Sequence, residues 1–325
     1  MIDFPTPILF IVFNRIESTK RVFEVIRNLR PAYLFVAADG ARLDVSDENE
    51  KCKAVREYVL SNVDWECEVK TLFRDVNLGC GLAPAAAISW FFEHVEEGII
   101  LEDDCVPHPD FFGYCKELLQ KYKNDNSIAV IGGDNFQEGQ VRGNASYYFS
   151  KYSYTWGWAT WRRVWQGYQF DLRKIDKTVM WLKINATFKT QTERSYWKSI
   201  FETISISHGE AWDYQLWFHV WYNGMYSIAP NVNLVKNIGF GENATHTHDS
   251  DSKQAFLDTQ SILPLVHPVF TKIDDEAVLY YFRNYWFGHS EQTLFSRFIS
   301  KLYTCISPKL ILGYRKVKKA LIRKK

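Results

Sequence analysis

Short apolar runs alternate with amphipathic stretches along the first 135 residues of the chain. Polar and turn-forming residues bound the runs, and the stretches between them repeat apolar side chains at helical spacing. This pattern predicts strands at residues 8–13, 33–38, 69–73, 99–101 and 128–131, and helices at residues 18–29, 47–60, 82–95 and 109–122. Strands this apolar, joined by helices, indicate an α/β fold with a mostly parallel central sheet covered by helices on both faces.

The rest of the chain is less regular. It predicts a strand at residues 225–228, a long helix within residues 178–206 and a helix at residues 274–287. From about residue 294 onward, apolar residues alternate with a run of cations. We divide the chain into a domain of residues 1–250, with a donor half at 1–135 and an acceptor half at 136–250, and a helical C-terminal extension at 251–325.

Charge is distributed unevenly along the chain. Residues 301–325 hold nine Lys or Arg and no acid, whereas the whole chain has a net charge of only +1, so the remainder is acidic. An acidic body argues against nucleic acid as a partner, because such binding needs a basic face on the folded domain. The basic tail favours contact with an anionic membrane surface, and a solvated helix or a protein-docking tail is the alternative.

Composition bears on location and on the use of aromatic residues. The six Cys lack paired spacing and predict reduced thiols in a cytoplasmic protein. No segment reaches the ~20 apolar residues of a membrane span, so we expect at most peripheral attachment at the inner face of the plasma membrane. The twelve Trp indicate either an aromatic core or a surface that stacks against sugar rings.

Polar residues follow several predicted strands at the ends where parallel sheets collect ligands. Asn14 and Arg15 follow the first strand, Asp39 follows the second, and the acids of residues 102–104 follow the fourth. No GxGxxG follows the first strand and no GxxxxGK[ST] occurs, which removes the main support for a dinucleotide site or a P-loop.

Three consecutive acids, Glu102, Asp103 and Asp104, form the sharpest feature of the sequence. They follow an apolar strand in the segment GIILEDDCVPHPDFF. Crowded carboxylates repel one another unless a cation or hydrogen-bond donors neutralise them. Mg²⁺ or Mn²⁺ takes such oxygen ligands and can share its shell with the phosphates of a nucleotide. The cluster therefore predicts a metal site, with a solvated acidic turn as the alternative.

The segment ILEDDCVPHPDFF resembles the acidic motif of GT-A fold glycosyltransferases, in the EDD form of the N-acetylglucosaminyltransferase I group. Further segments are similar in the same order: PILFIVFNR, AADGAR, RDVNLGCGLAPAAA, YTWGWATWRRVW, GEAWDYQLWFHVW and NVNLVKNIGFG. The resemblance spans about residues 6–248. It implies a Rossmann-like GT-A fold and a nucleoside-diphosphate sugar as the donor, with UDP as the default nucleotide.

The resemblance also implies a role for each matching residue. Asp104 would hold the metal, Asp103 would contact the donor ribose, and Glu102 would orient the outer shell or the base. The residues expected near the nucleotide base and ribose are Asn14, Arg15 and Asp39. Alternatively, Asn14 and Arg15 simply end a strand and Asp39 belongs to a turn.

Two further positions carry chemistry at predicted helix starts. Gly79 lies in NLGCGLAPAAA, where small residues allow close backbone approach and a helix N-terminus favours phosphate; an ordinary helix cap is the alternative. Asp213 follows Trp212 in AWDYQLW and is suited to act as the base of an inverting transfer. The resemblance places the base here too, but the family often has two acids after the Trp. Glu210 is the nearest substitute, and an N-cap is the alternative role of Asp213.

Aromatic and histidine residues complete the predicted site. Trp156, Trp158 and Trp161 would form an acceptor wall that stacks on a sugar ring and excludes water. His246, in THTHDSD, would add an imidazole to the metal shell, or would simply be exposed in a polar loop.

The sequence therefore predicts an inverting, metal-dependent glycosyltransferase that uses Mn²⁺ or Mg²⁺. Its partners would be a nucleotide-sugar donor and a hydroxyl of a glycan or lipid-linked acceptor, in bacterial surface polysaccharide synthesis. One alternative is a sugar-phosphate nucleotidyltransferase, although its glycine-rich, basic signature near the first strand is absent. Another is a binding protein for nucleotide sugars or glycans that has no catalytic activity.

Overall fold

The computed structural model describes residues 4–206, 211–240 and 253–287. It confirms every strand and helix predicted in the first 135 residues, with shifts of at most three residues at their ends. The strands are β1 (Ile8–Val12), β2 (Tyr33–Ala38), β3 (Glu68–Phe73), β4 (Glu97–Glu102) and β6 (Ile128–Gly132). The helices are α1 (Ile16–Leu29), α2 (Glu48–Ser61), α3 (Gly79–His94) and α4 (Asp110–Lys121).

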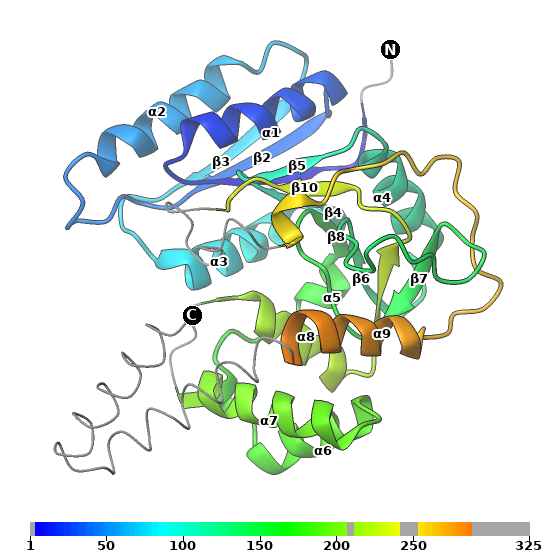
Figure 1. Ribbon diagram of the computed structural model, residues 1–325. Coiled ribbons are helices and arrows are strands. Elements are labelled where there is room, and N and C mark those ends of the chain that lie inside the picture. Colours follow the sequence, from blue (N-terminus) through cyan, green and yellow to red (C-terminus); the bar gives the residue numbers. More distant parts are fainter. Residues whose placement is uncertain (1–3, 207–210, 241–252, 288–325) are drawn as a thin grey trace, which may run out of the picture. The chain divides into compact units, whose positions relative to one another are not determined.

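An eight-stranded sheet, in the order β3-β2-β1-β4-β8-β6-β9-β7, lies at the centre of the described residues (Figure 1). β3, β2, β1 and β4 are parallel neighbours. β8 (Trp158–Trp161) runs antiparallel to β4 and β6, β9 (Tyr226–Pro230) runs parallel to β6, and β7 (Tyr147–Ser150) is antiparallel to β9. Six of these eight strands point the same way, which confirms the predicted, mostly parallel α/β sheet.

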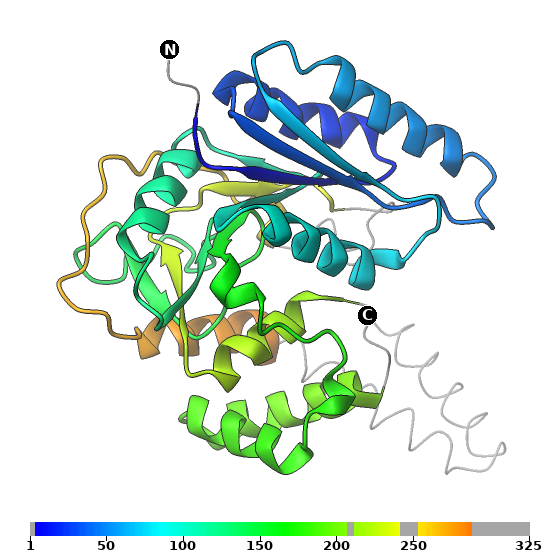
Figure 2. The ribbon, with the colours of Figure 1, turned by 180° about the vertical axis from the view of Figure 1, so that it is seen from behind.

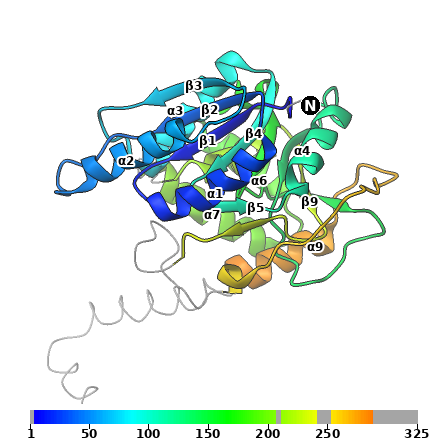
Figure 3. The ribbon, with the colours of Figure 1, turned by 90° about the horizontal axis from the view of Figure 1, so that it is seen from above.

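The order of the strands creates a switch point between β1 and β4. The chain moves outward from β1 to β3 and then returns to β4 on the other side of β1 (Figure 3). Because crossovers between parallel strands are right-handed, this reversal sends α1 and α2 to one face of the sheet and α3 to the other (Figures 1 and 2). A crevice for ligands forms at the carboxyl ends of strands at such a point.

The second half of the chain adds short elements around this sheet. The predicted strand at 225–228 corresponds to β9, and α7 lies within the predicted range 178–206, where α6 precedes it. β5 and β10 form a separate two-stranded antiparallel sheet. The bounds of the remaining elements are β5 (Cys105–Pro107), α5 (Arg162–Trp165), η1 (Leu172–Lys174), α6 (Lys177–Thr187), α7 (Gln191–Ile206), α8 (Asp213–Tyr222), β10 (Val235–Asn237) and η2 (Lys253–Phe256).

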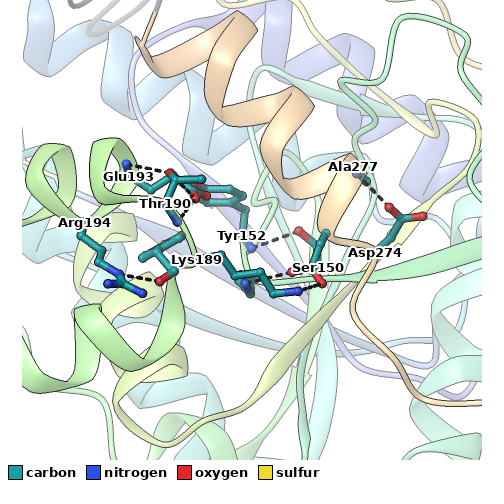
Figure 4. A network of polar contacts seen from close by, with 11 residues as sticks. Ser150, Tyr152, Lys189, Thr190, Glu193, Arg194, Asp274 and Ala277 are labelled. Atoms are coloured by element: carbon teal, nitrogen blue, oxygen red, sulfur yellow. Dashed lines mark hydrogen bonds and ion pairs between the residues drawn. The ribbon is translucent and has the colours of Figure 1, made fainter.

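Hydrogen bonds cap the start of α7, shortly after α6 ends (Figure 4). The Glu193 amide donates to Thr190 Oγ1 at 3.2 Å, and the Thr190 amide donates to Glu193 Oε2, also at 3.2 Å. This reciprocal pair is a capping box, which satisfies amide groups that the first turn of a helix leaves without partners. The chain therefore ends one helix and begins another within three residues, 188–190.

Most of the aromatic content serves packing. Eight of the twelve Trp side chains are buried. Trp197, Trp217 and Trp221 form one cluster with Tyr152 and Phe188, with ring centroids 4.8–6.2 Å apart. An aromatic core, rather than an extended binding surface, thus accounts for the larger part of the Trp residues.

Contacts divide the chain into two compact units, Met1–Val278 and Leu279–Lys325. The predicted helix at 274–287 is confirmed as α9 (Asp275–Tyr281) followed by a π-helical turn, η3 (Phe282–Phe287). At the start of α9, Asp274 Oδ1 accepts a hydrogen bond from the Ala277 amide (Figure 4). The division of function at residues 135 and 250 stays a prediction, and the basic tail lies outside the described residues. Among those residues, none of the helices combines the length and the apolar character that a bilayer crossing requires.

Candidate functional site

The predicted acids lie at the switch point of the sheet. Glu102, the last residue of β4, is in register with Ile11 of β1. Asp103 and Asp104 therefore emerge beside the polar residues that follow β1. The structure thus brings together two groups that lie about ninety positions apart in the sequence, the acidic cluster and the segment Phe13 to Arg15.

The two aspartates of the cluster have different surroundings. Asp103 is buried, and its Oδ2 accepts a hydrogen bond from the Phe13 amide at 3.0 Å. Asp104 is partly exposed, and its Oδ2 lies 3.2 Å from Nη1 of Arg15. The other oxygen of Asp104, Oδ1, accepts from the Cys105 thiol at 3.4 Å. Asp103 therefore ties β4 to β1, whereas Asp104 presents its carboxylate at the edge of the sheet.

Crowding and burial change the acidity of this cluster. Burial, and after it the charges of Asp104, Asp103 and Asp213, raise the pKa of Glu102 to about 8. Burial and the Asp104 charge raise the pKa of Asp103 to about 7, against the opposing effects of Arg15 and the Phe13 amide. Because the Asp213 charge acts on Glu102, the predicted base lies within electrostatic range of the predicted metal site.

A close backbone approach covers Asp104. β10 pairs with β5 and carries residues 238 and 239 over the acid, and the Ile238 amide donates to the Asp104 carbonyl at 2.8 Å. A Cβ atom on Gly239 would lie 2.1 Å from Asp104 Oδ2. Any larger residue here would therefore force the Asp104 side chain to move. Gly239 was not predicted as a site residue, although it lies in the segment NVNLVKNIGFG.

Asp213 lies at the start of α8, next to packed aromatic residues. It is the first residue of the helix, and its Oδ1 accepts from the Tyr214 amide at 3.0 Å. The preceding Trp212 stacks on Trp158 with centroids 5.5 Å apart and receives a hydrogen bond from the Tyr168 hydroxyl at its carbonyl oxygen. Burial, and then the charge of Asp213, raises the pKa of both Tyr168 and Tyr214. Packed rings thus fix the backbone that carries this carboxylate.

A buried glutamate organises the end of β1. Glu48, at the start of α2, is 1% exposed and accepts hydrogen bonds from Asn14 Nδ2 at 2.8 Å and from the Arg42 amide at 2.7 Å. The guanidinium of Arg42 also pairs with Glu48 and holds the pKa of that carboxyl below its usual range. Asn14 therefore has a fixed orientation beside Arg15. Glu48 was not predicted, because nothing in the local sequence distinguishes it from the other acids of α2.

Asp39 and Gly79 contact each other. Asp39 follows β2, and its carboxylate accepts hydrogen bonds from the amides of Leu78 and Gly79 at 2.9–3.0 Å. Gly79 has φ +80°, a conformation that side chains rarely adopt. An aspartate from the neighbouring strand thus caps α3 and supplies the negative charge that this helix N-terminus favours.

The three predicted acceptor tryptophans differ in exposure. Trp158 and Trp161, in β8, are 0% and 2% exposed, and both belong to the core. Trp156 is half-buried, and its ring contacts Phe136 and Phe240 at centroid distances of 5.1 and 5.8 Å. Phe240 directly follows Gly239, the residue against Asp104. Of the three, Trp156 alone is both partly accessible and adjacent to the acidic cluster.

A further buried acid, Asp134, follows β6. It is 2% exposed, and its Oδ1 accepts from the Trp156 amide at 3.3 Å. Burial raises the pKa of this carboxyl well above its usual range. Asp134 was not predicted, although it fits the pattern of the other site residues, a polar residue just after an apolar strand. Two predicted residues, His246 and Glu210, lie outside the described residues.

The fold and these residues define a class of molecule, an α/β protein with an acidic site at the switch point of its sheet. No protein-family model matches the chain, and neither does any curated protein. Among solved structures, the chain is similar to HddC from Yersinia pseudotuberculosis, with 7% identity and a TM-score of 0.32 over 50% of this chain and 80% of HddC. It is also similar to S. aureus TarS 1–349, with 9% identity and a TM-score of 0.32 over 49% of this chain and 48% of that one. At these values neither similarity indicates a function.

Proposed function

We propose that this protein is a metal-dependent glycosyltransferase that takes a sugar from a nucleoside-diphosphate donor, with a UDP-sugar favoured. The observation that carries the proposal is the cluster of Glu102, Asp103 and Asp104 at the switch point, within electrostatic range of Asp213. The reaction needs one carboxylate to hold a cation at the leaving group and another to accept a proton. The cluster and Asp213 offer both.

Asp104 is the residue suited to hold Mg²⁺ or Mn²⁺. Its carboxylate is partly exposed, while Asp103 is turned toward β1, and both ions take carboxylate oxygen as a ligand. The described residues include no group of three or more potential ligands. Oxygen atoms of the donor diphosphate would therefore supply part of the shell, with His246 as a further proposed ligand. A cation held there would offset the charge that develops on the departing diphosphate.

Asp213 is the proposed base. The acceptor hydroxyl gives its proton to the Asp213 carboxylate while its oxygen forms a bond to the anomeric carbon of the donor. The bond between that carbon and the diphosphate oxygen breaks on the opposite side, so the anomeric configuration inverts. Trp156 would stack on the acceptor and keep water away from the donor. Asn14, Arg15 and Asp39 would line the donor side of the site.

The acceptor is proposed to be a hydroxyl of a glycan or of a lipid-linked glycan. The aromatic contacts of Trp156 with Phe136 and Phe240 favour a sugar ring on the acceptor side. The basic tail of residues 301–325 favours an anionic membrane surface, where lipid-linked acceptors of bacterial surface polysaccharides are found.

Thermal unfolding with UDP-, GDP-, CMP- and dTDP-sugars, each with and without Mn²⁺, tests the donor class. We expect one nucleotide to raise the melting temperature clearly, and only when Mn²⁺ is present, because a ligand that binds the folded state stabilises it. Equal melting temperatures under all conditions would contradict the proposal.

Asp213→Asn separates catalysis from binding. We expect donor-induced stabilisation to persist while release of nucleotide from the donor falls by about 100-fold or more, since the proton acceptor is lost. Asp176→Asn is the matched control, because it makes the same change at the start of α6 and should leave release unchanged. A wild-type protein that binds the donor without releasing nucleotide would be a binding protein. Release of pyrophosphate from a nucleoside triphosphate would indicate a nucleotidyltransferase.

A further inference from the structure

Arg15 forms an ion pair with Asp104, the carboxylate that is proposed to hold the cation. Its Nη1 lies 3.2 Å from Oδ2 of Asp104. Two further groups contact that carboxylate, because the Cys105 thiol donates to Oδ1 and the Gly239 backbone lies against Oδ2. A cation cannot reach Oδ2 from the side of α1 without displacing the guanidinium of Arg15.

The backbone of Arg15 is held in place, so only its side chain can move away. Arg15 is the N-cap residue of α1, and its carbonyl oxygen accepts hydrogen bonds from the Thr19 amide at 3.0 Å and the Thr19 hydroxyl at 2.7 Å. The side chain is 28% exposed, which leaves room for another orientation. The N-terminus of α1 also favours an anion close to Arg15, since the helix dipole places positive charge there.

Charge decides which ligand can displace Arg15. A divalent cation arriving alone would compete with the guanidinium for one oxygen, and the two positive charges would repel each other. A nucleoside diphosphate that arrives with the cation brings negative charge of its own and gives Arg15 a new partner, because guanidinium groups pair well with phosphate.

We infer that Arg15 is the internal counter-ion of Asp104 in the ligand-free protein, so that a divalent cation and a nucleoside diphosphate bind as a pair and the cation binds weakly alone. The inference rests on the proposed function and extends it to the order of binding. Arg15, predicted to lie near the base and ribose, would thus also contact the diphosphate where it meets the cation.

Titration of Mn²⁺ into the full-length protein, followed by the electron paramagnetic resonance signal of free Mn²⁺, tests this inference. For the wild type, we expect UDP to increase Mn²⁺ affinity by about tenfold or more. For Arg15→Gln, which removes the charge, we expect Mn²⁺ alone to bind about tenfold or more tightly than it binds the wild type. UDP should then increase Mn²⁺ affinity by a smaller factor than in the wild type.

Arg27→Gln is the matched control, because it removes the same charge from the last turn of α1, where Arg27 pairs with Asp64. This variant should bind Mn²⁺ alone as weakly as the wild type. An equal gain in Mn²⁺ affinity in Arg15→Gln and in the control variant would overturn the inference. Such a gain would reflect the total charge of the protein rather than the ion pair with Asp104. Arg15→Ala repeats the test if Arg15→Gln unfolds, and Arg15→Lys should behave like the wild type.

The outcomes separate the inference from the proposed function. If Arg15→Gln and Arg15→Ala bind Mn²⁺ alone no more tightly than the wild type, while UDP still promotes Mn²⁺ binding, the inference is wrong and the proposed function stands. If UDP fails to promote Mn²⁺ binding in the wild type and in every variant, the metal-dependent function itself is contradicted, and the inference fails with it.

Discussion

Glu102 illustrates how its neighbours set the chemistry of a single carboxyl group. Its pKa in the folded protein is about 8, against an ordinary value of 4.5. The folded state therefore holds the proton that the unfolded chain releases between these two values. Stability is highest below the ordinary pKa and falls as the pH rises toward 8. Asp103, with a pKa of about 7, contributes in the same direction.

We therefore expect Glu102→Gln to flatten the fall in stability between about pH 5 and pH 8. The variant keeps a neutral side chain at all pH values, so it should melt several degrees higher than the wild type at pH 8 and close to it at pH 5. Melting temperatures across this range provide the measurement. Glu50→Gln, an exposed position on α2, is the control. Parallel pH curves for the wild type and Glu102→Gln would contradict this account of the cluster.

Trp156 and Trp158, two residues apart, should respond differently to replacement. Trp156→Ala should raise the KM for the acceptor about fivefold to tenfold, as expected for loss of one aromatic contact, with little effect on stability. Trp158→Ala should destabilise the protein by about 3–5 kcal/mol, because its side chain is fully buried. Denaturant unfolding and steady-state kinetics on both variants separate the two roles. A stable Trp158→Ala variant with impaired acceptor use would reverse the assignment.

Single site residues could be predicted where a polar residue follows an apolar strand. Residues distant in the sequence that contact them in the fold could not. Residues 102–104 were found because three acids end a buried strand. Gly239 was missed because it lies against Asp104, where a Cβ atom would come within 2.1 Å of Oδ2, only through the pairing of β5 with β10. Glu48 was missed for a similar reason, since its partner Asn14 is thirty-four positions away.

The stability of α7 depends on a single side chain at its start, Thr190. Thr190→Ala should remove the capping box of α7 and cost about 1 kcal/mol in the free energy of unfolding. Donor affinity should not change, because Thr190 and Glu193 bond to each other at the junction of α6 and α7. Thr192→Ala, an exposed neighbour in the same turn, is the control. Urea unfolding of both variants provides the measurement, and equal losses in stability would show that the box is not the cause.

Periodicity identified the long elements and missed the short ones. β1 to β4 and α1 to α4 are each five or more residues long and were predicted within three residues at their ends. β8 has four residues, and it follows Gly157, whose φ of +72° interrupts any strand pattern. Its position between β4 and β6 depends on pairing with both strands, so no local signal predicts this antiparallel strand.

For the whole molecule, strand order decides where the chemistry lies. Because the chain returns from β3 to β4 across β1, the acids after β4 meet the polar residues after β1 at the switch point. α8 adds a second carboxylate, Asp213, within range of the first group. The alternation of strands and helices predicted this arrangement in outline, since a mostly parallel sheet of this kind collects ligands at one edge.

The most direct test of the account is a crystal structure of the protein with Mn²⁺ and UDP, in which anomalous scattering locates the metal. The account predicts an anomalous peak within about 2–2.5 Å of a carboxylate oxygen of Asp104, with the diphosphate bound to the same ion. A nucleotide bound elsewhere, with no metal at Asp104, would contradict it.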